Sequence, residues 1–66
     1  MIAPEISEVV TLDIYRIKDT NIFWGFDTQT QHYFVADWDK RVVISGDFDN
    51  FEETESGALE YWNSYV

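Results

Sequence analysis

The sequence contains no cysteine, which excludes disulfides and thiolate metal sites from this 66-residue chain. Basic residues are also scarce: four Lys and Arg face 13 Asp and Glu, and the formal net charge is −9. Because phosphate contacts need cationic side chains, we expect no direct binding to nucleic acid or to anionic membranes. No apolar run approaches the ~20 residues of a membrane-spanning helix, and the first residues lack the features of a signal peptide. The expected location is therefore cytoplasmic.

Motifs for catalysis and for cofactors are missing as well. The only histidine is His32, and no serine lies in a G-x-S-x-G context. Neither glycine-rich phosphate-binding pattern occurs. Pairs of carboxylates are present, but so short a chain has little room for a substrate cleft. We expect neither an enzyme nor a cofactor-binding protein.

What the chain does contain is typical of a folded domain, since 45% of its residues are hydrophobic and 18% aromatic. β-Branched and aromatic residues gather in four segments that short turn-forming sequences separate. Short connections favour antiparallel pairing, because parallel strands need long crossovers. The predicted strands are residues 9–18, 22–26, 32–38 and 41–46.

From residue 50 onward the apolar spacing becomes that of an amphipathic helix. Asp49, followed three residues later by Glu52, matches the capping-box pattern that marks a helix start. Gly57 costs about 1 kcal/mol relative to Ala inside a helix, and it is either tolerated or allows another group to approach closely. The predicted apolar stripe consists of Phe51, Ala58, Leu59, Trp62, Tyr65 and Val66.

These elements predict a single domain, residues 1–66, of the α+β class. A four-stranded antiparallel meander (β-β-β-β), residues 9–48, follows an N-terminal arm, residues 1–7. One C-terminal amphipathic helix, residues 50–66, is expected to pack on one face of the sheet.

The middle strands are apolar on both faces, although one short helix can cover only one face. An uncovered apolar face marks a contact site. Depending on hairpin register, its side chains are drawn from Phe23, Tyr33, Phe34, Val35, Trp38 and Val43. We assign an aromatic partner-binding face to Phe23, Tyr33, Val35 and Trp38. A homodimer is the simplest occupant, because one surface then serves both copies.

Acidic residues accumulate toward the C-terminus, where the chain has no Lys, Arg or His from Val42 onward. Carboxylates on a rigid surface can imitate phosphates, and attraction to a basic surface speeds association. The segment 47–52 departs from the EF-hand pattern, because Phe51 occupies a ligand position and the glycine is missing, so no metal is expected. The predicted acidic partner-binding face consists of Asp47, Asp49, Glu52, Glu53 and Glu60.

Two functions stay open. The first is an inhibitor or regulator whose acidic face engages a basic, nucleic-acid-binding surface of a partner. The chain is similar to small acidic DNA-mimic proteins of phages and mobile elements that block restriction or CRISPR enzymes. This similarity is one of charge and size only, since no sequence motif supports it. The second is a non-catalytic structural or accessory subunit, which acts through the aromatic sheet face as a homo-oligomer or on a larger complex.

Overall fold

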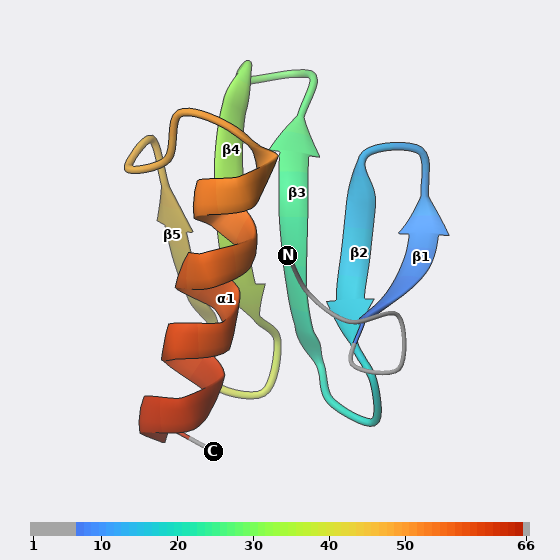
Figure 1. The fold of residues 1–66 in the computed structure, drawn as a ribbon, viewed down its shortest axis with the longest axis vertical. Helices are drawn as coiled ribbons and strands as arrows, with labels where there is room; N and C mark the ends of the chain where they lie inside the picture. The colour runs from blue at the N-terminus through green and yellow to red at the C-terminus, as the bar shows by residue number, and fades with distance from the viewer. Residues whose placement is uncertain (1–6, 66) are drawn as a thin grey trace.

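The computed structural model describes residues 7–65, which form one antiparallel sheet and one helix (Figure 1). The five strands lie side by side in chain order. The elements are β1 (Ser7–Thr11), β2 (Ile14–Ile17), β3 (Ile22–Asp27), β4 (His32–Asp37), β5 (Val42–Ser45) and α1 (Phe51–Tyr65). The α+β class, with an antiparallel sheet and a C-terminal helix, is confirmed. Residues 1–6 of the expected arm, and Val66 at the expected helix end, lie outside the described residues.

The prediction of four strands is wrong, because the first predicted strand is itself a hairpin. β1 and β2 pair across the two-residue turn Leu12-Asp13, and Asp13 adopts a φ of 80°. Aspartate is among the few residues that enter the left-handed region readily. Between the pairs Val9–Tyr15 and Thr11–Ile14 the register shifts, which leaves Val10 as a β-bulge. The apolar alternation runs through this turn and hides it.

Gly25 of β3 leaves space for the β1–β2 turn beside it. It lies opposite Ile14 and has a φ of 154°, and a Cβ atom at this position would collide with the carbonyl oxygen of Asp13. That carbonyl instead accepts a 2.9 Å hydrogen bond from the backbone N–H of Phe26. A glycine is therefore required where β3 passes the first turn.

The two later hairpins share a turn that fixes their register. Asp27 and Asp37 end their strands, and each accepts a hydrogen bond at Oδ1 from the backbone N–H two residues on, at 2.9 and 3.0 Å. Gln31 and Arg41 close the turns with φ values of 60° and 57°. Such Asx turns reverse the chain at a defined residue and so decide which side chains share a face.

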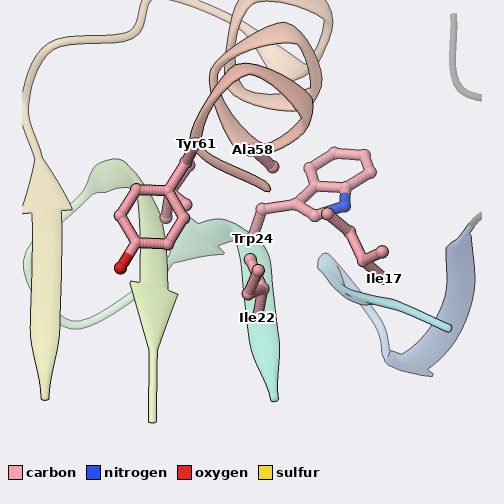
Figure 2. Packing of buried hydrophobic residues seen from close by; sticks show 6 residues of the cluster. Ile17, Ile22, Trp24, Ala58 and Tyr61 are labelled. Carbon is pink, nitrogen blue, oxygen red and sulfur yellow. The ribbon is translucent and has the colours of Figure 1, made fainter. Parts of the chain in front are cut away.

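The core lies between the sheet and α1. Cross-strand pairing places Tyr15, Trp24, Val35 and Ile44 in one row on the helix side. α1 lies over this side, roughly along the strands (Figure 1), and Ala58 and Tyr61 project from it toward the sheet (Figure 2). The buried cluster consists of Ile17, Ile22, Trp24, Val35, Ala58 and Tyr61.

The helix start differs by one residue from the predicted capping pair. Asn50, not Asp49, is the N-cap: its Oδ1 accepts a 2.9 Å hydrogen bond from the N–H of Glu53. The Glu53 side chain reaches back to the N–H of Asp49 at 3.3 Å. Asn and Asp are about equally good N-caps, so residue type does not separate the two registers.

Gly57 permits a close approach, which was one of its two predicted roles. The ring of Phe48, from the segment between β5 and α1, lies where a side chain at position 57 would be. A Cβ atom there would come within 2.7 Å of Phe48 Cζ. The glycine therefore allows the β5–α1 connection to pack closely against the helix.

Candidate protein-binding surfaces

The sheet face opposite α1, called here the open face, is apolar and lacks a covering layer within residues 7–65. Its side chains surround a shallow depression of about 510 Å³ that extends over all five strands. Of the described residues in the lining, Asp27 is the only charged one. The apolar residues of the open face are Val10, Ile14, Phe23, Phe34, Ala36, Trp38 and Val43.

Ala36 occupies the middle of the open face. Phe23 and Val43 lie directly opposite it on the neighbouring strands, and Phe34 and Trp38 lie two residues away along the chain. Ala36 is 4% exposed, whereas Trp38 and Val43 are 56% and 61% exposed. The Phe23 and Trp38 rings meet edge to face at 6.2 Å between centroids. The open face thus has a small residue ringed by four larger ones, with an exposed indole at its rim.

The structure divides the predicted aromatic face between the two sides of the sheet. Phe23 and Trp38 belong to the open face. Placing Tyr33 and Val35 with them is wrong: Val35 is 2% exposed in the core, and Tyr33 packs edge to face on Phe51 of α1 at 5.1 Å. Both faces of β4 are apolar, and a one-residue choice of register exchanges them.

The predicted set omitted five apolar residues of the open face, which are Val10, Ile14, Phe34, Ala36 and Val43. A signal for the last three exists in the neighbouring strands, where polar Arg16 and Ser45 interrupt the apolar sequence. Arg16 lies in the cross-strand row of Phe23, Ala36 and Val43, and Ser45 lies opposite Phe34. Polar residues on edge and flanking strands therefore mark the solvent side of the sheet.

The predicted acidic residues are all exposed. Asp47 and Asp49 flank Phe48 in the β5–α1 connection, and the others lie on α1. Glu52, Glu53 and Glu60 border a shallow hollow beside Phe48 and Gly57. Among the described residues none of the five acids forms an ion pair. The name acidic face is kept here for Asp47, Asp49, Glu52, Glu53 and Glu60.

An ion pair lies beside the open face. Glu8 and Arg16 are cross-strand neighbours of β1 and β2, and Nε of Arg16 donates to Oε1 of Glu8 at 2.8 Å. The two side chains are 37–38% exposed. The charges of Glu8 and Arg16 cancel at the β1–β2 edge of the sheet, so the open face carries little net charge.

Asp37 is the buried carboxylate of the described chain, at 4% exposure. Its Oδ2 accepts a 2.7 Å hydrogen bond from the Tyr61 hydroxyl, and its Oδ1 accepts from the N–H groups of Asp39 and Lys40. The Tyr61 hydrogen bond is the largest influence on the pKa of Asp37 and lowers it below its ordinary value, against the opposing effect of burial. An ionised carboxylate whose partners belong to a turn and a helix has a structural role, not that of a tuned acid.

Within residues 7–65 no three His, Asp or Glu side chains gather as metal ligands. In the same part of the chain, α1 lacks the length and the apolarity needed to cross a membrane. Comparisons with protein-family models, with curated proteins and with solved structures find no match to this chain.

Proposed function

We propose that this protein is a non-catalytic binding module, an inhibitor or regulator that engages a basic surface of a partner protein through its acidic face. The observation that supports this proposal is the set of five exposed carboxylates without ion pairs among the described residues. They belong to a chain of net charge −9.

The local structure holds these carboxylates on a rigid support. The Asn50 cap and the contact between Phe48 and Gly57 fix the β5–α1 connection against the helix. A backbone fixed in this way loses little conformational entropy on binding, and the field of its carboxylates accelerates the encounter with a basic partner. A nucleic-acid-binding groove is the kind of surface that such a group of carboxylates complements, as in DNA mimicry.

A salt titration with matched charge variants tests this proposal. Partners captured from the source cell on the immobilised protein at low salt should be released at about 0.5 M NaCl, where charges separated by more than about 4 Å are screened. Glu52→Gln/Glu60→Gln should reduce capture. Asp13→Asn/Asp19→Asn removes the same charge elsewhere, at two residues of positive φ that Asn tolerates, and should capture normally. Equal capture by both variants, or capture that salt does not weaken, contradicts the proposal.

A second function is supported by a different observation, the open face, which no other part of residues 7–65 covers. An apolar sheet face of this kind suits a structural or accessory subunit, either a homo-oligomer or a component of a larger complex. Binding there would depend on Phe23, Trp38 and Val43 and would resist salt, so the two functions differ in a measurable way.

A further inference from the structure

We infer that two copies of this chain pair through their open faces, each placing Trp38 over Ala36 of the other. This inference rests on the second function proposed above and names the partner of the open face as a second copy.

The shape of the open face supplies both halves of the contact. The shallow depression of the open face includes Ala36 between Phe23, Phe34, Trp38 and Val43, whose side chains leave Ala36 4% exposed, and the exposed Trp38 at its rim is a projecting group. A twofold axis that lies in the plane of the interface, midway between Trp38 and Ala36 and perpendicular to the line joining them, brings each indole over Ala36 of the other copy. Packing of sheet on sheet in this way is common, and the side chains of the two faces interdigitate.

The charge distribution favours this face for self-association. A second copy also carries a net charge of −9, so it is repelled wherever carboxylates are exposed. Among residues 7–65, Asp27 is the only charged residue that lines the depression, and the nearby Arg16 and Glu8 neutralise each other. With the open faces in contact, both α1 helices point outward. The three glutamates of each acidic face lie on α1 and are then about 20 Å from the other copy, well beyond the Debye length of about 8 Å at physiological salt.

The area of the open face meets the lower requirement of a specific dimer. Five strands of four to six residues present a face of about 400 Å² in projection. Two such faces in contact remove on the order of 1,000 Å² of accessible surface from water, the lower end for specific interfaces. We therefore expect a reversible dimer with a Kd of about 1–100 µM, weaker than an obligate one.

Analytical ultracentrifugation of the full chain over about 5–500 µM tests the inference, because a dimer of this Kd forms within that range. Dimerisation should stay constant or strengthen when NaCl is raised from about 0.15 to 0.5 M, since salt screens the remaining repulsion. Trp38→Ala and Ala36→Leu should each raise the Kd at least about tenfold. Tryptophan emission should shift to shorter wavelength with concentration in the wild type and not in Trp38→Ala.

Two exposed strand valines provide a matched pair of variants. Val43→Lys places a charge on the open face and should abolish the dimer. Val9→Lys places the same charge at a residue that pairs with Tyr15 on the other side of the sheet and should leave the dimer intact. Circular dichroism verifies that all variants are folded.

The possible outcomes separate the inference from the proposed functions. A wild type that stays monomeric overturns the pairing, while salt-sensitive binding through the acidic face is unaffected. A dimer indifferent to Trp38→Ala and Val43→Lys overturns the assignment to the open face. A monomer that loses another protein on Val43→Lys, and not on Val9→Lys, overturns the second copy as occupant but keeps the accessory-subunit function.

Discussion

The hydroxyl of Tyr61, on α1, donates a 2.7 Å hydrogen bond to Oδ2 of Asp37, the last residue of β4. Both residues are buried, at 8% and 4% exposure. The Oδ1 atom of the same carboxylate accepts the backbone N–H groups of the β4–β5 turn. One carboxylate thus connects the helix to the turn that sets the register of the last hairpin.

Removing the Tyr61 hydroxyl should destabilise the fold. Tyr61→Phe leaves Oδ2 of a buried, ionised carboxylate without this donor, which costs about 1.5–3 kcal/mol. Urea denaturation followed by circular dichroism measures the change. Tyr15→Phe, in a half-buried ring that stacks on Trp24 at 4.5 Å, is the control and should change stability by about 0.5 kcal/mol or less. Equal losses in the two variants would show that the bond to Asp37 contributes nothing specific.

The same carboxylate should make stability depend on pH in acid. The pKa of Asp37 is lower in the folded state than its ordinary value of 3.8. The unfolded chain therefore binds the proton first as pH falls, so this contribution is complete above the ordinary value and is lost as pH falls through the folded-state pKa. Urea midpoints measured from neutral pH into this range should fall more steeply for the wild type than for Asp37→Asn. If the urea midpoints of the two proteins fall equally with pH, Asp37 is not the source of this pH dependence.

The fold class was predictable from the sequence because it depends on local chemistry. β-Branched runs and the change to helical spacing after Asn50 are local signals, and the antiparallel sheet and the helix follow from them. The first turn was not predictable in this way. Val10, Leu12 and Ile14 continue an unbroken alternation, and the reversal depends on Asp13 entering positive φ beside Gly25, a contact between distant parts of the chain.

The two candidate surfaces also differ in how far they could be predicted from the sequence. Exposure of the acidic face could be predicted, since carboxylates without cations nearby in the sequence stay in water whatever the strand register. The open face could not be assigned residue by residue, because Tyr33 and Val35 are as apolar as Phe34 and Ala36. The Asx turns at Asp27 and Asp37 select the register, and the Asp37 carboxylate is also held from α1 by Tyr61.

The helix cap gives a test that separates two adjacent residues. Asn50→Ala removes the acceptor for the Glu53 N–H and should cost about 1 kcal/mol. Asp49→Ala keeps its backbone N–H and so keeps its bond to Glu53, and it should cost about 0.5 kcal/mol or less. Urea unfolding of both variants decides the matter. A larger loss for Asp49→Ala would restore the capping register predicted from the sequence.

Adding a methyl group at Gly57 should destabilise the protein, although alanine is the better helix former by about 1 kcal/mol. In Gly57→Ala the new Cβ atom meets the Phe48 ring, so the ring must leave its place on the helix. We expect a net loss of about 1–3 kcal/mol, as for other overpacked contacts. In a Phe48→Ala background the obstruction is absent, and Gly57→Ala should then stabilise by about 1 kcal/mol. A double-mutant cycle by urea denaturation measures this reversal of sign, and the same sign in both backgrounds would show that Phe48 does not explain the glycine.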